Sequence, residues 1–206
     1  MIVDGEANGL PTLSDLSVNG MARTVRWETG QRDFMLPGCS RMAAPSAESF
    51  SGTTAYRYHP ITVDAPLRID AVLVNVDAGV AGGLGVAGIY AADARWQPTR
   101  LVANGGQFDA SGTGNKTLTF RETLLPPGNY LTAVQCNGNA FNLKHLTANP
   151  PIGYQVNRST PLQYGGFIRF ESATVTFGPL LPFGPPIVAA TNSDAGFRYH
   201  VVLRPV

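Results

Sequence analysis

The stretch RLVANGGQFDASGTGNKTLTFRETLLPPGNY, from Arg100 to Tyr130, decides the fold class. Its centre, GTGNKT, has the letters of a nucleotide-binding loop, but such a loop needs a glycine directly before the lysine and a helix directly after it. Here Asn115 precedes Lys116, and the following residues alternate with period two until Pro126 and Pro127. A helix cannot run through that pattern. The stretch therefore predicts a strand, a turn, a second strand and a Pro-Pro-Gly turn, with no nucleotide site.

The residues on both sides of this stretch extend the pattern of short strands. Leu67–Val76 is aliphatic and β-branched, which predicts a central strand without a wet face. No long helical period occurs, although Ala140–Ala148 has room for one helical turn. Strands spaced about a dozen residues apart are typical of an antiparallel β-sandwich. Further strands are expected over Leu84–Ala92, Asn129–Cys136, Phe167–Phe177 and Gly196–Val206, the last with Val201 and Leu203 facing inward and His200 outward.

Composition indicates one folded domain with an attached arm. Of 206 residues, 44% are hydrophobic and 14% charged, so the chain should fold, while 23 Gly and 16 Pro favour strands and turns over helices. Residues 1–50 carry chain-breaking residues at short intervals and weak periodicity apart from Ala22–Thr29. We therefore expect an all-β protein: an extended N-terminal arm over 1–50 and a jelly-roll-like antiparallel β-sandwich over 51–206.

Charge and hydropathy argue against several classes of partner. The net charge of +1 predicts no attraction to nucleic acid or to an anionic membrane. No apolar stretch approaches the roughly 18 residues that a membrane span requires, and no signal-peptide pattern begins the chain. Lys116 and Lys144 are the only lysines among 15 basic residues, and arginine suits subunit contacts. We expect folding in a cytoplasm, no membrane insertion and no nucleic-acid partner.

The histidines, cysteines and aspartates show no spacing in the sequence that is typical of a catalytic or metal site. The three histidines stand far apart, so we expect them singly at a surface or an interface. Cys39 and Cys136 predict two reduced, buried thiols and not a zinc site. Aspartates for a Ca²⁺ loop are present without a ligand-like spacing. We therefore expect no enzyme, no catalytic residue, no metal and no cofactor. The histidines are His59, His145 and His200, and the aspartates are Asp70, Asp77, Asp93 and Asp109.

Aromatic residues outside the expected strands are the candidate contacts. Trp96 lies in a loop, where it would pack against the core, contact a subunit or stack on a glycan. Tyr154 and Tyr164 lie in the proline-rich stretch 149–166 and are candidates for receptor or subunit contact. Trp27 and Phe34 are the candidate anchors of the arm.

The segment from about 55 to 140 resembles a β-sandwich module of tailed-bacteriophage virion proteins, especially tail fibres. That module has a Gly-Ile-Tyr strand core, a short turn with Asp and Pro, a Leu-Val strand, a Thr-Gly-x-Lys turn and a Leu-Pro-x-Gly-x-Tyr turn. Two positions depart from it: Val86 replaces the usual arginine, and no tryptophan follows Tyr130. The matching residues are Gly88, Ile89, Tyr90, Asp93, Pro98, Leu101, Val102, Gly105, Thr113, Gly114, Lys116, Leu125, Pro126, Gly128, Tyr130, Leu131 and Ala133.

The resemblance implies a structural protein of a phage particle, assembled in the host cytoplasm and located in the virion. It further implies a homotrimer whose arm binds other virion proteins, acting as a tail fibre or receptor-binding protein on a host surface glycan or protein. A capsid spike, decoration or adaptor protein is the alternative within this class. A carbohydrate-binding module is an alternative of another class. So is a polysaccharide-degrading enzyme, which would need a carboxylate pair such as Glu122 and Glu171.

Overall fold

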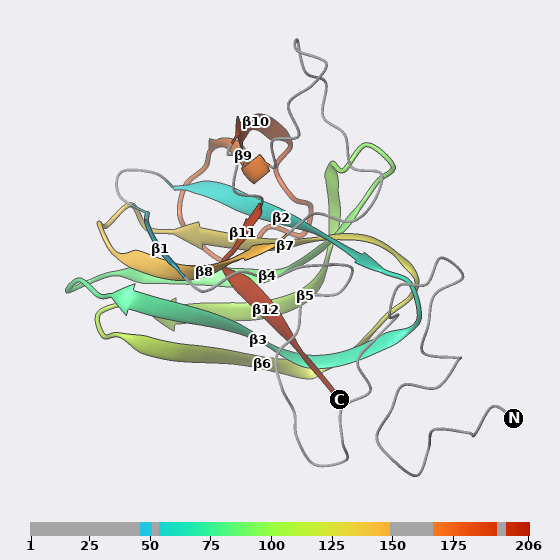
Figure 1. The fold of residues 1–206 in the computed structure, drawn as a ribbon, viewed down its shortest axis with the longest axis horizontal. Helices are drawn as coiled ribbons and strands as arrows, with labels where there is room; N and C mark the ends of the chain where they lie inside the picture. Colours follow the sequence, from blue (N-terminus) through green and yellow to red (C-terminus); the bar gives the residue numbers. More distant parts are fainter. Residues whose placement is uncertain (1–45, 51–53, 149–166, 193–196) are drawn as a thin grey trace, which may run out of the picture. The chain divides into compact units, whose positions relative to one another are not determined.

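The computed structural model describes residues 46–50, 54–148, 167–192 and 197–206. Within these ranges the chain forms twelve strands and no helix, in two antiparallel sheets packed on each other (Figure 1). The expected all-β antiparallel sandwich is confirmed. Several residues named above lie outside the described ranges: Trp27, Phe34, Cys39, Tyr154, Tyr164 and the strand expected over Ala22–Thr29.

The first sheet is built around β3 (Leu67–Ala78). Its strand order is β1–β8–β3–β12, with β6 pairing with β3 and β11 pairing with β8. Figure 1 shows β3 and β6 running side by side along their length. The other strands of this sheet are β1 (Ser46–Ser49), β6 (Gly114–Leu125), β8 (Asn142–Ala148), β11 (Phe197–Tyr199) and β12 (Val201–Pro205).

The second sheet has the order β10–β9–β2–β7–β4–β5, and every pairing in it is antiparallel. β2 and β7 lie at its centre, where nearly all side chains are buried. The bounds are β2 (Ala55–Val63), β4 (Leu84–Ala92), β5 (Pro98–Asp109), β7 (Gly128–Cys136), β9 (Phe167–Thr174) and β10 (Ile187–Asn192).

The stretch from Arg100 to Tyr130 forms strand, turn, strand and turn, as its pattern predicts. β5 ends at Asp109, whose side chain accepts hydrogen bonds from the Ser111 amide and hydroxyl. Gly114 begins β6 at a φ of 104°, a conformation that side chains other than glycine strongly disfavour. Because β5 belongs to one sheet and β6 to the other, this turn carries the chain between the layers. GTGNKT is the end of this sheet-to-sheet turn, Gly112 and Thr113, followed by the first four residues of β6.

β3 is central, as expected, but the prediction that neither of its faces contacts solvent is wrong. Its residues alternate between buried and half-buried positions, with Ile69, Val72 and Val74 fully buried. The other face carries polar groups with cross-strand partners. Asp70 accepts a hydrogen bond from Arg204 of β12 at 2.6 Å, and Asn75 bonds to Asn115 of β6. These pairs explain why an apolar sequence tolerates a half-exposed face.

The face of the second sheet that carries three buried tyrosines is covered by the segment from Leu180 to Pro185, and glycine allows close packing there. Tyr56, Tyr58 and Tyr90 are each at most 1% exposed and pack ring against ring. A Cβ atom at Gly88 would lie 2.5 Å from both the Ala103 carbonyl oxygen and Leu180 Cδ1. Gly88 of the Gly-Ile-Tyr core is therefore required by packing, not by backbone torsion.

Three local expectations need correction or refinement. No helical turn forms over Ala140–Ala148: Asn142–Ala148 is β8, in which Leu143 and His145 are buried and Lys144 is exposed, a period of two. The chain end forms two strands interrupted at His200, which is 3% exposed and does not face outward. Ser46–Phe50 falls within the expected arm, yet β1 pairs with β8 and Phe50 is 1% exposed.

Candidate functional site

Trp96 lies in a tight turn that joins β4 to β5. The amides of Arg95 and Gln97 both donate to Asp93 Oδ1 at 2.8 Å, and the Trp96 amide donates to the Asp93 carbonyl oxygen at 3.0 Å. Trp96 itself has a φ of 61°, a left-handed conformation that is uncommon for a bulky residue. Its side chain is half-buried and packs against the core. The structure thus places Trp96 as a partly exposed packing residue on a well-bonded turn.

A proline-rich loop, Gly178–Pro186 (the Phe183 loop), lies along the first half of β5. The Leu101 amide donates to the Pro182 carbonyl oxygen at 2.8 Å, and the Gly184 amide donates to the Thr99 carbonyl oxygen at 2.9 Å. These bonds give the loop the role of an added strand segment, and Arg100 and Phe183 form an isolated β-bridge. The loop therefore covers part of an open sheet edge.

Three buried tyrosine hydroxyls from β2 and β4 form hydrogen bonds with the backbone of the Phe183 loop. Tyr58 donates to the Pro185 carbonyl oxygen at 3.1 Å, Tyr90 donates to the Leu181 carbonyl oxygen at 2.8 Å, and Tyr56 accepts from the Leu181 amide at 3.2 Å. Burial raises the pKa of Tyr58 and of Tyr90, so both hydroxyls keep the protons that they donate. With four prolines and these bonds, the loop is preorganised.

The Phe183 loop presents large apolar side chains to solvent. Leu180 points into the core and is 5% exposed, whereas Leu181 is 41% and Phe183 74% exposed. Val188, just beyond the loop on β10, is 64% exposed. Isolated exposed apolar residues are common, but several on a rigid segment mark an interaction surface.

The Trp96 turn and the Phe183 loop are neighbours. The Ile187 amide at the end of the loop donates to Gln97 Oε1 at 2.9 Å, and a Cβ atom at Gly184 would lie 2.5 Å from Pro98 Cβ. The structure thus brings Trp96 next to an exposed apolar surface that the sequence analysis missed. A signal existed: the run GPLLPFGPPIVAA has no polar residue, yet its prolines exclude a helix or a central strand. Tyr154 and Tyr164, the other contact candidates, are not among the described residues.

The histidines do not stand singly, contrary to expectation. His59, His145 and His200 are each at most 4% exposed and lie together in the interior. Nevertheless, no group of three or more His, Cys, Asp or Glu side chains in the described ranges is arranged to hold a metal ion. Cys136 is buried with a free thiol, as predicted, and burial raises its pKa.

The acidic candidates are each engaged separately. Glu122 on β6 pairs with Arg68, and Glu171 on β9 pairs with Arg57, so the structure does not pair these two carboxylates with each other. The four aspartates considered for Ca²⁺ also have separate partners. Asp70 binds Arg204, Asp77 binds Lys144, and Asp93 and Asp109 accept hydrogen bonds in their own turns.

No family model, curated protein or solved structure matches this chain. Across the residues that the structure describes, no helix is long and apolar enough to cross a membrane. What the protein does must therefore be inferred from its own residues, of which the Trp96 turn and the Phe183 loop are the most distinctive at the surface.

Proposed function

We propose that this chain is a structural component of a tailed-phage particle, most simply the β-sandwich of a homotrimeric tail-fibre or receptor-binding protein. The observation that supports this is where the residues of the phage resemblance lie. Gly88 allows close packing against Ala103 of β5 and Leu180, Asp93 organises the Trp96 turn, and Gly114 supplies the left-handed residue of the inter-sheet turn. Tyr130 closes the Pro-Pro-Gly turn by donating to the Pro126 carbonyl oxygen at 2.7 Å.

These residues support a shared framework because they are the positions that a fold needs and a catalytic site does not. A turn residue or a close-contact glycine is fixed by backbone geometry, so a resemblance confined to such positions is a resemblance of architecture. The function of such a scaffold lies in its surfaces. The Phe183 loop supplies one, and its rigidity limits the entropy lost on binding.

The surface suits a second copy of this chain. Exposed charges of both signs accompany the apolar residues: Asp93 and Arg95 lie in the Trp96 turn, and Arg100 forms the β-bridge with Phe183. A surface that carries both signs can complement itself in a symmetric assembly. With a net charge of +1, copies of the chain do not repel each other at long range.

The mass of the purified chain in solution tests the oligomer. Sedimentation or light scattering should give a particle of three times the 21.9 kDa chain mass at micromolar concentration. A stable monomer at that concentration would contradict the trimer. Antibodies against the sandwich, applied to purified particles of the encoding phage, should label the tail; label on the head would assign a spike or decoration role, and no label on any particle would refute the proposal.

A further inference from the structure

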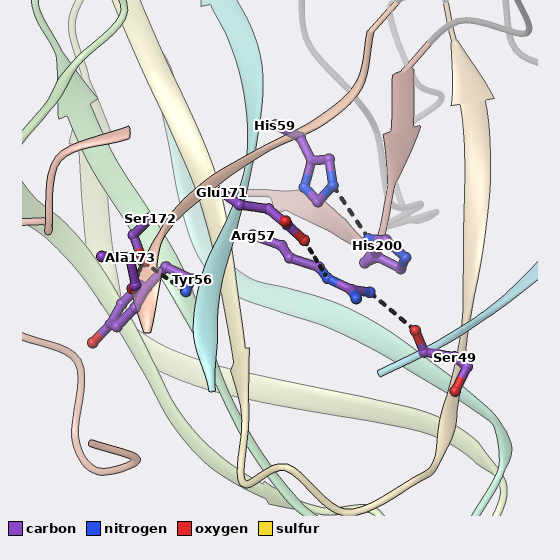
Figure 2. Close-up of polar contacts among 8 residues, drawn as sticks. All are labelled: Ser49, Tyr56, Arg57, His59, Glu171, Ser172, Ala173 and His200. Carbon is purple, nitrogen blue, oxygen red and sulfur yellow. Dashed lines mark hydrogen bonds and ion pairs between the residues drawn. The ribbon is translucent and has the colours of Figure 1, made fainter. Parts of the chain in front are cut away.

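The three histidines of the chain meet in one buried cluster that joins the two sheets. His59 belongs to β2 of the second sheet, His145 to β8 of the first, and His200 to the link between β11 and β12. His200 Nδ1 lies 3.2 Å from His59 Nε2 (Figure 2). The ring centroids of His145 and His200 are 5.7 Å apart. The cluster is therefore a direct polar contact between the two layers, in addition to the apolar packing that joins them.

Arg57 lies beside this cluster and is 4% exposed. Figure 2 shows its guanidinium between Glu171 and Ser49: Nε lies 3.3 Å from Glu171 Oε1, and Nη1 donates to the Ser49 carbonyl oxygen at 3.2 Å. The guanidinium carbon also lies 3.7 Å from the centroid of the Phe50 ring, whose edge-on neighbour is His200, with centroids 4.8 Å apart. The Phe50 ring therefore lies between the positive guanidinium of Arg57 and His200 of the histidine pair.

The charged and titratable groups on the surrounding elements favour neutral histidines. The carboxylate that the described residues bring here is Glu171 of β9, which is engaged by Arg57. Cys136 of β7 stays a neutral thiol because burial raises its pKa. On β8, Lys144 is exposed and pairs with Asp77, at 3.5 Å.

Burial, and then the positive charges of the neighbouring groups, set the protonation of His59. Burial lowers the pKa of His59 well below 6.5, and His200, Arg57 and His145 lower it further. His59 is therefore neutral at pH 7 and resists protonation as the pH falls.

The contact between the two imidazoles limits how many protons the pair can hold. One ring nitrogen donates and the other accepts, so the contact survives while at least one of the two rings is neutral. If both rings become imidazolium, two N–H groups point at each other and two positive charges lie beside Arg57. The contact then becomes repulsive.

We propose that the His59–His145–His200 cluster is an acid-sensitive latch that holds the two sheets together at this end and opens on acidification. When it is closed, neutral His200 is bonded to His59. When it opens, His200 leaves the interior, and His59 and His200 can then both take up protons, so acid favours the open state over the closed pair, which cannot hold two protons. Because His200 links β11 to β12, its release loosens the pairing of β11 with β8 and of β12 with β3.

The pH dependence of folding tests the latch. His59 has a lowered pKa in the folded state, so the unfolded chain binds more protons, and stability present above pH 6.5 is lost as the pH falls below it. Each buried histidine that stays neutral lowers the folding constant about tenfold between pH 7.5 and 5.5. Urea denaturation should show at least that loss, since ordinary Asp and Glu do not titrate in this range. A loss smaller than twofold would overturn the proposal.

Variants and a direct titration separate the latch from a general acid effect. In His200→Gln the side chain can still bond to His59 but cannot be protonated, so the loss of folding constant should shrink about tenfold; an unchanged loss would refute the role of His200. Glu122→Gln, on the exposed face, should leave the wild-type loss intact. If His200→Gln does not fold, NMR titration of the wild-type imidazole C–H signals decides. A histidine that stays neutral well below pH 6.5 supports the latch, and ordinary titration of all three refutes it.

Amide hydrogen exchange tests where the opening occurs. After correction for the intrinsic rate, protection of β12 amides paired with β3 should fall at pH 5.5 relative to pH 7.5. Amides pairing β4 with β5, at the far end of the second sheet from β9 and separated from β2 by β7, serve as the internal control and should keep their protection. Equal protection of β12 at both pH values, or an equal loss in both strand pairs, would argue against a local latch.

Discussion

At the scale of single residues, the Arg57–Glu171 and Arg68–Glu122 ion pairs are chemically alike but differ in environment. The side chains of Arg57 and Glu171 are 5% and 22% exposed, whereas those of Arg68 and Glu122 are 61% and 43% exposed. Burial lowers the pKa of Arg57 while Glu171 opposes that shift, so the guanidinium depends on its carboxylate partner. An exposed pair has water as an alternative partner and contributes little.

Glu171→Gln should therefore destabilise the protein much more than Glu122→Gln. The first leaves a buried guanidinium with a weaker partner, which costs about 1–3 kcal/mol of unfolding free energy. The second should change it by less than about 0.5 kcal/mol. Urea denaturation of both variants at pH 7.5 measures the two effects. Equal effects would show that the Arg57 site is as well solvated as the surface pair.

At the scale of elements, the Phe183 loop is a segment without regular structure that is held as firmly as a strand. Its polar backbone atoms are satisfied by tyrosine hydroxyls below and by β5 at its side. A neutral hydrogen bond contributes about 0.5–1.5 kcal/mol, and leaving a buried carbonyl without its donor costs more. The position of Phe183 at the surface therefore depends on side chains that are themselves buried.

Tyr90→Phe should loosen the loop without disturbing the sandwich elsewhere. The Leu181 carbonyl oxygen loses its donor, so the amides of Leu101 and Gly184, which pair with the loop, should exchange faster with solvent. Tyr130→Phe is the matched control, because it removes a hydroxyl that bonds to Pro126 in another turn. Hydrogen exchange resolved by residue distinguishes the two. Unchanged exchange at Leu101 and Gly184 in Tyr90→Phe would show that the prolines alone hold the loop.

The elements could be predicted from the sequence where the information is local. The short apolar run Leu84–Ala92 predicts a strand and forms β4 with those bounds, and the period-two pattern after Gly114 excludes a helix there. β8 was missed because its alternation is short: Leu143 and His145 are buried, but no long polar–apolar run surrounds them. The histidine cluster was beyond such reasoning because His59 and His200 are 141 residues apart in the chain. Only strand order brings them together.

At the scale of the whole sandwich, the open edges of the two sheets are the places where another chain could pair with the protein. β5 ends the second sheet, and within the described ranges the outer edge of β6 pairs with no strand. Long open edges invite uncontrolled pairing with other chains. The Phe183 loop covers the start of β5, and a register shift where Ile69 and Ala71 face Thr123 and Thr119 distorts β6. Association through the apolar loop is then favoured over association through strand edges.

Phe183→Ser should weaken self-association if the Phe183 loop is the contact between copies. Phe183 is 74% exposed in the single chain, so its replacement removes apolar area from an interface while leaving the isolated fold almost unchanged. Leu124→Ser is the matched control, because Leu124 is an exposed apolar residue, 47% exposed, on β6 of the other sheet. Sedimentation at several concentrations should show an association constant lowered at least tenfold by Phe183→Ser and changed less than threefold by Leu124→Ser. If Phe183→Ser assembles like the wild type, the loop faces some other partner, and the contact between copies lies elsewhere on the chain.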